Sequence, residues 1–322
     1  MLRAAPVKYV ARRLLQGVFV LWAAYTLSFL ILFTLPGDAA TVAAAGGGDA
    51  STVDPKLVEQ LRHEYGLDQP LWLQYLHALG KALRGDFGSN PQTGQPALHE
   101  VTQVLPNTLG LAAAALVLAV VVGFLLAVAS TFPRAAWLRQ ALGALPPLGA
   151  AVPVFWIGLL LLQWFSFHLR WFPSLGDEGF RSLVLPAVTL AVPTGAYIAQ
   201  LLSRSLRLTL GRPYIEQVRA KGAGEARVHF AHALRNAVLP TLTMVGVLIG
   251  NLLAGTVVTE TVFSRTGVGR LVVQAVGDRD LPVVQVVVVF AALVFVVSSL
   301  AVDLVYPLID RRIVLGRAAA TA

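Results

Sequence analysis

Few residue patterns in this chain could perform chemistry. A phosphate-binding loop of the form G-x-x-x-x-G-K-[ST] is absent from the 322 residues, and the nearest fragment, Gly80-Lys81-Ala82, lacks the hydroxyl residue that such a loop uses to hold Mg²⁺. No histidine pair has the spacing of metal ligands, no nucleophile has a base near it, and the chain contains no cysteine. We therefore predict a protein without catalytic residues, without a metal site and without a cofactor of its own.

Three residues stand out because they lie in or beside strongly apolar stretches. Glu260 follows a long apolar run, and an ionisable group at membrane depth is costly unless it is paired or hydrated. Pro153 and Pro193 lie inside apolar runs, where each proline leaves backbone carbonyls that neighbouring helices or water must satisfy. The alternative for Glu260 is a helix-end carboxylate among the lipid headgroups, and the alternative for both prolines is an ordinary place in a membrane helix.

Composition decides the class of protein that must position these residues. With 56% hydrophobic and 13% charged residues, the chain is too apolar for a soluble protein, so most of its surface must face lipid. The net charge of +8 could indicate nucleic-acid binding, but the basic residues are spread between apolar runs and are not grouped on one polar domain. We therefore attribute the charge to membrane topology and predict no nucleic-acid partner.

Six runs without Asp, Glu, Lys or Arg are each at least 22 residues long, whereas roughly 20 residues cross a bilayer as a helix. The runs are 14–37, 101–133, 140–169, 182–203, 236–259 and 281–302. The first run is too long for the apolar core of a cleaved signal peptide, which spans about 7–15 residues. We predict an all-α integral membrane protein with six transmembrane helices and a helical outer segment between the first and second.

The loops between these runs differ in charge. If both termini lie in the cytoplasm, the cytoplasmic segments hold sixteen basic and three acidic residues, and the outer segments hold nine basic and thirteen acidic ones. Cytoplasmic loops carry the excess of Lys and Arg, so this orientation is the predicted one. The chain then divides into residues 1–35 with the first helix, an outer segment 36–100, a five-helix core 101–312 with a cytoplasmic loop 204–240, and a cytoplasmic tail 313–322.

The loop 204–240 contains a polar, basic stretch from Pro213 to Pro240 that predicts two helices joined by a sharp bend. Pro213 suits a first helical position, and Gly222-Ala223-Gly224 tolerates the left-handed dihedral angles that end a helix. A second helix can begin at Glu225 and continue into the next apolar run. The first helix has an apolar face formed by Tyr214, Ile215 and Val218 and a charged face formed by Glu216, Arg219 and Lys221.

This stretch resembles the cytoplasmic loop of ABC importer permeases, in the branch that serves dipeptides, oligopeptides and nickel. The match is carried by Arg219-Ala220-Lys221-Gly222 and by His232-Ala233-Leu234-Arg235-Asn236-Ala237 with Leu239-Pro240, although Gln217 and Val218 stand where the wider superfamily most often has alanines. In that family the loop forms a coupling helix in a groove of an ATPase subunit. The resemblance implies an ATPase contact by Tyr214, Ile215, Glu216, Val218, Arg219, Lys221, Gly222, Ala223 and Gly224. We expect the apolar face to supply most of the affinity and the charges to set orientation.

Further blocks resemble the same family in the same order along the chain. They are Gly66-Leu67-Asp68-Gln69-Pro70, Gln74-Tyr75, Gly85-Asp86-Phe87-Gly88, Leu105-Pro106-Asn107-Thr108-Leu109, Thr259-Glu260-Thr261-Val262-Phe263, Gly267-Val268-Gly269-Arg270-Leu271 and Arg279-Asp280-Leu281-Pro282-Val283-Val284-Gln285. The resemblance implies a type I ABC importer permease fold in a bacterial or archaeal cytoplasmic membrane. It also places Glu260 near the outer end of the translocation pathway, and the prolines Pro153 and Pro193 are further pathway candidates because of their positions in apolar runs.

The activity that the resemblance implies is import of dipeptides or oligopeptides by alternating access. ATP and Mg²⁺ would be bound by two ABC ATPase subunits or domains. The other implied partners are a second homologous permease subunit, an extracytoplasmic substrate-binding protein and membrane lipid. Nickel or another small solute is the alternative substrate within the family. The alternative outside it is an autonomous secondary transporter, which would show charged residues at midplane in broken helices.

Overall fold

The computed structural model describes residues 4–34, 41, 55–56, 58–59, 68–90, 92–278 and 280–309, without the side chains of residues 4–11, 32–34, 243 and 301–309. Regular structure in this part of the chain is helical, apart from one isolated bridge between Ser89 and Pro96. The predicted all-α class is therefore confirmed. The predicted helical segment 36–100 lies partly outside the described residues.

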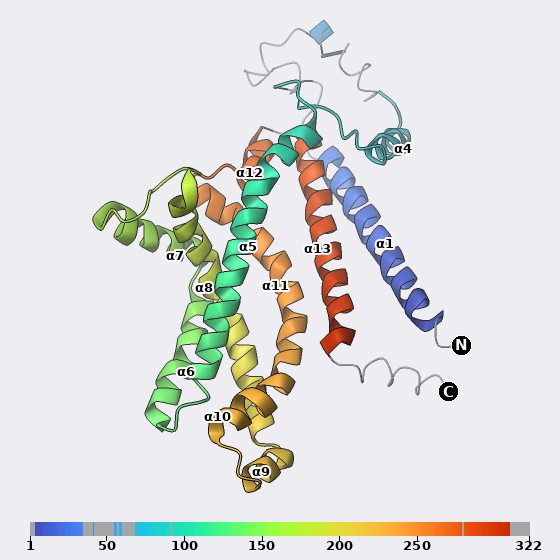
Figure 1. Cartoon of the computed structure of the whole chain (residues 1–322). Helices are drawn as coiled ribbons and strands as arrows, with labels where there is room; N and C mark the ends of the chain where they lie inside the picture. The colour runs from blue at the N-terminus through green and yellow to red at the C-terminus, as the bar shows by residue number, and fades with distance from the viewer. Residues whose placement is uncertain are drawn as a thin grey trace. The chain divides into compact units, whose positions relative to one another are not determined.

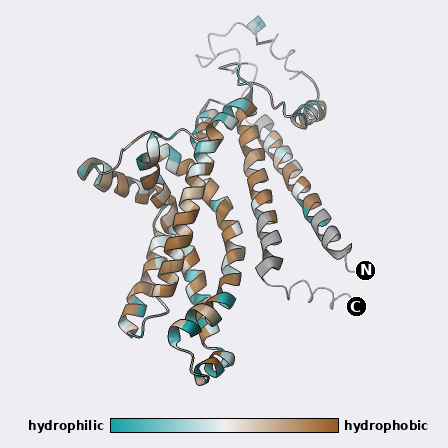
Figure 2. Cartoon of the chain, viewed as in Figure 1, coloured by the Kyte–Doolittle hydropathy of each residue, from teal (hydrophilic) through white to brown (hydrophobic). Residues whose placement is uncertain are grey.

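Among the described residues, five helices are long and apolar enough to cross a membrane, or six if one bent pair counts as a single span. The five are α1 (Ala4–Thr34), α5 (Ala97–Ala129), α8 (Gly179–Leu210), α11 (Leu234–Val262) and α13 (Leu281–Ile309). Figure 1 shows their course, and Figure 2 shows that their middle turns are mostly hydrophobic. They correspond to five of the six predicted runs.

The remaining run, 140–169, is not a straight helix. It comprises the end of α6 (Ala136–Ala151), α7 (Val154–Leu161) and a π-helical segment η2 (Leu162–His168), with a bend of 103° at the break. Pro153 has no backbone N–H and disfavours helical dihedrals at the residue before it, and Val152 is accordingly extended, with φ −82° and ψ 129°. A count of uncharged residues cannot detect this break.

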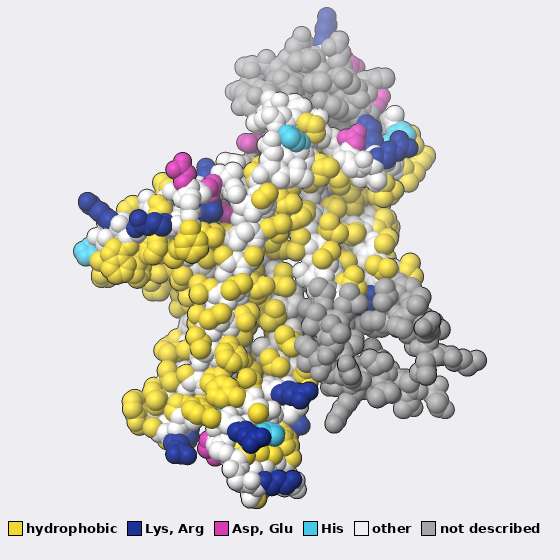
Figure 3. Space-filling view, viewed as in Figure 1, with side chains coloured by type: hydrophobic (Ala, Val, Ile, Leu, Met, Phe, Trp, Pro, Cys, Tyr) yellow, Lys and Arg dark blue, Asp and Glu magenta, His cyan; other side chains and the backbone are white. Residues whose placement is uncertain are grey.

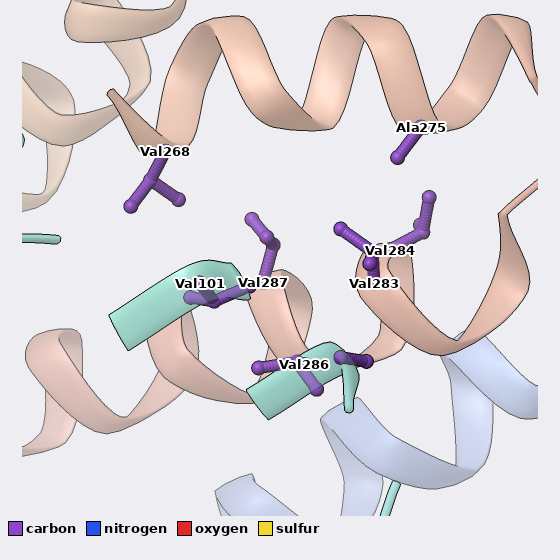
Figure 4. Packing of buried hydrophobic residues seen from close by; sticks show 8 residues of the cluster. Val101, Val268, Ala275, Val283, Val284, Val286 and Val287 are labelled. Carbon is purple, nitrogen blue, oxygen red and sulfur yellow. The ribbon is translucent and has the colours of Figure 1, made fainter. Parts of the chain in front are cut away.

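Contacts divide the chain into two compact units. One unit comprises residues 1–108 and 266–296, and the other comprises residues 109–265 and 297–322. In the first unit, α12 (Val268–Gly277) packs with the beginnings of α5 and α13 around a cluster of small aliphatic residues. Figure 4 shows Val268 and Ala275 of α12 facing Val287 and Val284 of α13.

Polar groups hold the helix ends of this first unit. The hydroxyl of Thr108 accepts a hydrogen bond of 2.8 Å from the Val268 N–H at the beginning of α12. A carboxylate oxygen of Asp280 accepts one of 3.1 Å from the Val283 N–H in the first turn of α13. Because Asp280 is buried, its pKa is raised from 3.8 to about 6. In segment 36–100, α4 (Leu71–Ala82) is tied to α1 by a 2.8 Å hydrogen bond between Tyr75 and Thr26.

In the second unit, α8 is the central helix. In the most apolar stretch of α8, 67% of the residues are buried. The helices α6, α7 and α11 pack against α8. The backbones of α5 and α8 approach each other closely, because a Cβ atom added to Gly123 would lie 2.7 Å from the carbonyl oxygen of Gly195. Only glycine permits this separation, as in other membrane helix pairs that meet through small residues.

Candidate functional site

The basic segment, residues 204–240, contains the elements that the sequence predicts. Helix α9 (Pro213–Ala220) begins with its proline in the first turn and ends where Gly222 adopts φ +84°. The Gly222 N–H donates to the Arg219 carbonyl at 2.9 Å and the Ala223 N–H to the Val218 carbonyl at 3.3 Å. This pair of bonds is a Schellman closure, in which glycine supplies the left-handed residue. The predicted helix and glycine bend are therefore confirmed.

A second helical stretch follows the bend, but part of it is not α-helical. It starts as α10 (Glu225–Arg227), widens into a π-helical segment η3 (Val228–Ala233) and enters α11 at Leu234. The sequence predicts a helix from Glu225 but gives no signal for the π turn. Each π turn holds more residues than an α turn, so η3 changes which residues of this stretch face the interior.

The apolar face of α9 is turned toward the chain's own core. Ile215 is 0% exposed and packs in a cluster with Ala127, Leu202, Leu206, Val228, Ala233 and Ala237. Tyr214, Val218 and Ala223 are half-buried against the same cluster, and the Tyr214 hydroxyl accepts a 3.0 Å hydrogen bond from the Asn236 amide. Ile215 is therefore not accessible to a partner, whereas the expected contribution of the half-buried Tyr214 and Val218 to an ATPase contact stays a prediction. Periodicity shows that the three residues share a face, but not which body covers it.

The exposed side of α9 and of the bend is polar or small. Glu216, Arg219, Lys221, Gly222 and Gly224 are all exposed. Arg219 donates from Nε and Nη2 to the two carboxylate oxygens of Glu225, at 3.1 and 3.2 Å. The hydrogen bond from Arg219 lowers the pKa of Glu225. This exposed pair contributes little stability on its own, yet it spans the glycine bend and links α9 to α10.

A buried histidine connects the basic segment to the turn between α5 and α6. His229 is 3% exposed, its Nε2 lies 3.2 Å from the hydroxyl of Thr131, and its ring meets Phe132 edge-on at 5.5 Å. Burial lowers the pKa of His229, although the nearby Glu225 carboxylate opposes this shift. The lowered pKa favours the neutral imidazole at this buried position.

The three residues singled out beside apolar runs lie on three different elements. Glu260 is 1% exposed near the end of α11. Pro153 precedes the first turn of α7, at the 103° break. Pro193 is half-buried inside α8, which continues through it without interruption. Only Pro153 thus bends its element. In the described part of the chain, no group of three His, Cys, Asp or Glu could hold a metal ion.

Comparison with known proteins gives the family. Residues 119–315 match the family model described as "Binding-protein-dependent transport system inner membrane component", and residues 6–112 match the model of the corresponding N-terminal region. The chain belongs to this family. It is the permease of an ABC importer and a multi-pass inner-membrane protein, so the predicted family is confirmed.

Full-length relatives agree with this assignment. The permease is 38% identical over 313 residues to "Probable peptide ABC transporter permease protein y4tP" of Sinorhizobium fredii, covering 95% of this chain and 98% of the relative. It is 35% identical over 302 residues to the "Glutathione transport system permease protein GsiC" of Escherichia coli strain K12, covering 94% and 97%. A solved structure of the MetNI methionine ABC transporter has a TM-score of 0.56 at 18% identity, covering 65% of this chain and 95% of that one. This last likeness supports the predicted fold.

One structural residue of the permease was not predicted from the sequence. Arg265, 5% exposed in the turn after α11, donates to the carbonyls of Gly176 and Ser182 at 3.3 and 3.0 Å and lies 3.4 Å from a carboxylate oxygen of Asp177. The backbone N–H of Arg265 donates to the Glu260 carbonyl at 2.8 Å. One guanidinium thus joins the loop before α8 to the end of α11. The sequence shows an arginine in an outer loop, which the charge count treats only as a topology signal.

Proposed function

We propose that this permease moves small peptides into the cytoplasm by alternating access, while partner subunits hydrolyse ATP. The observation that carries the proposal is the similarity over 95% of the chain to a relative named for peptide transport. Another relative is named for glutathione, which is itself a small peptide, so the two relatives favour peptides over nickel. Nickel or another small solute is the second candidate substrate.

The proposed assembly contains a second permease subunit, two ATPase subunits or domains that bind ATP and Mg²⁺, and an extracytoplasmic substrate-binding protein. The family description, which names a binding-protein-dependent transport system, supports the last of these. Glu260, Pro153 and Pro193 are proposed to act along the pathway. The 103° bend supports a hinge role for Pro153 more directly than for Pro193, whose helix is continuous.

The proposed ATPase contact is the exposed side of α9 and its bend. Glu216, Arg219, Lys221, Gly222 and Gly224 are exposed there, whereas the apolar side is covered by the permease itself. A Cβ atom added at Gly222 or Gly224 would meet no atom of this chain within 4 Å. These glycines therefore leave a flat surface on which another protein could approach the backbone closely.

Gly222→Val is expected to uncouple transport from ATP hydrolysis. A β-branched residue resists φ +84°, and the left-handed conformation costs a non-glycine residue about 1–2 kcal/mol, so the bend should reopen. Reconstituted with its ATPase and binding-protein partners, the wild-type permease should take up a labelled peptide and not Ni²⁺. The variant should lose at least about tenfold in peptide uptake and in peptide-stimulated ATP hydrolysis.

Two matched variants separate bend geometry from surface contact. Asparagine tolerates left-handed dihedral angles, so Gly222→Asn should keep the bend, and any loss of uptake in this variant then reports a partner packed on this spot. Gly224 has an ordinary φ of −68°, so Gly224→Ala changes the surface only. Wild-type uptake by Gly222→Val would refute the coupling role, whereas Ni²⁺ uptake in place of peptide uptake would refute the substrate class alone.

The proposed orientation places both termini and the basic segment in the cytoplasm. Reporter fusions after Phe132 and at Gly224 should therefore report cytoplasm, and fusions at Gly176 and Gly277 should report the outer face, because Lys and Arg are concentrated in the former loops. If a reporter that is active only on the outer face is active at Gly224, the proposed orientation is wrong.

A further inference from the structure

The second unit has a hollow of about 530 Å³ where the basic segment begins, at the ends of α5, α6 and α8. It is lined by Ser130, Thr131, Ala136, Arg139, Gln140, Gly143, Ala144 and Arg207. Figure 3 shows that dark-blue Lys and Arg side chains predominate among the charged groups at this end of the unit, in the lower part of the view. Neither the family description nor the proposed coupling surface accounts for this hollow.

The polar groups of the hollow favour an anion. Two of the eight lining residues are arginines, and none is acidic. The Arg139 guanidinium is positioned by its Nη1, which donates to the carbonyls of Pro133 and Arg134 at 3.0 and 3.1 Å. Arg207 reaches the Ser203 hydroxyl from Nη2 at 3.4 Å. Guanidinium groups match the oxygen atoms of a phosphate in geometry and charge, and the Gln140 amide offers further donors.

The surroundings of the hollow favour a lipid over a free anion. On α6, which forms one wall, Trp137 is 71% exposed and Leu145 and Leu148 are also exposed. Exposed Trp and Leu side chains on a membrane helix face the interface and the acyl chains. A phosphate in the hollow would therefore have an apolar helix surface next to it, along which fatty acyl chains can lie.

We propose that this hollow binds the phosphodiester headgroup of an anionic phospholipid, with Arg139 and Arg207 as its ligands. The proposal rests on the orientation given above, which places both arginines at the cytoplasmic leaflet, where anionic lipids attract basic side chains and where basic pockets between membrane helices bind headgroups. A lipid held here touches the ends of three helices next to His229 and thus next to the basic segment.

The test is native mass spectrometry of the detergent-purified transporter complex titrated with phosphatidylglycerol, with phosphatidylcholine as the neutral lipid. Wild type should retain phosphatidylglycerol preferentially. Arg139→Gln and Arg207→Gln should each weaken that retention about fivefold and the double variant about 25-fold, as expected for one near-surface cation each. Arg204→Gln is the matched control, because Arg204 is an exposed arginine one turn away on α8 that does not line the hollow.

A second variant keeps every charge. Gly143 lines the hollow, and a Cβ atom added there would meet nothing within 4 Å, so Gly143→Leu should fill the space while α6 stays helical. It should also displace phosphatidylglycerol. Unchanged retention in both Gly143→Leu and the double arginine variant would overturn the proposal.

Two other results would also overturn it. If inorganic phosphate displaces the lipid at millimolar concentration, or binds equally well, the site recognises a free anion. If the double arginine variant instead releases the ATPase with lipid retention unchanged, the hollow is a protein interface. Neither result bears on the substrate, and a loss of lipid retention without loss of peptide uptake leaves the proposed transport function intact.

Discussion

Arg265→Met is expected to destabilise the permease by about 3–5 kcal/mol, the usual cost of removing one partner from a buried charge pair. Methionine keeps most of the side-chain volume but provides no donors. Without the guanidinium, the carbonyls of Gly176 and Ser182 would lose a hydrogen-bond donor. The Asp177 carboxylate would lose the positive charge beside it. Denaturant unfolding of the purified protein in detergent, followed by circular dichroism, measures the change.

Three variants test this explanation. Arg265→Lys should recover part of the stability, because an ammonium group keeps the charge but lacks the planar fork. Arg181→Met, in the neighbouring first turn of α8, removes an exposed arginine and should cost less than about 1 kcal/mol. Asp177→Asn combined with Arg265→Met should cost less than the sum of the single changes, since each removes the other's partner. A cost below 1 kcal/mol for Arg265→Met would show that water replaces the guanidinium.

Gly123→Ala is expected to destabilise the permease by about 1–3 kcal/mol, although alanine is the best helix former. The added methyl group would lie 2.7 Å from the Gly195 carbonyl oxygen and 2.8 Å from Cβ of Ile198, so α5 and α8 would have to separate. Gly110 is on the same helix and has no atom within 4 Å of its added Cβ. Gly110→Ala should therefore be neutral or stabilise by up to about 1 kcal/mol.

The two alanine substitutions should have different effects on the stability of one and the same helix, which makes them a direct test of the α5–α8 contact. Thermal inactivation in the same detergent is a sufficient measurement. Equal effects at both positions would mean that helix propensity, and not the close approach of the two backbones, governs this contact.

Local features of the fold could be predicted from the sequence because they depend on local composition. Uncharged runs of more than 20 residues located the spans, and Gly222 after a short amphipathic stretch located the end of α9. The break before α7 could not be obtained in this way. Pro153 marks a possible kink in the sequence, but prolines at positions 146, 147, 186, 193 and 240 lie inside continuous helices. The sequence alone does not show which of these prolines interrupts its element.

Features that join distant segments were not predictable. Arg265 finds its acceptors more than 80 residues earlier in the chain, at Gly176 and Ser182. The apolar face of α9 was correctly identified as a face, yet its covering residues come from α5, α8, η3 and α11. Sequence periodicity gives the direction in which side chains point relative to one another, and it contains no information on what they meet. The roles assigned to the individual coupling and pathway residues stay predictions.

The burial of Ile215 has a mechanical consequence. This side chain is packed among Leu202 and Leu206 of α8 and Ala237 of α11, so α9 is not loosely attached to the rest of the unit. A force applied to the exposed side of α9 would therefore act on α8 and α11 together. The exposed Arg219–Glu225 pair crosses the glycine bend from α9 to α10. The short helix α9 is therefore attached to both α8 and α11, and a movement of α9 would involve both of them.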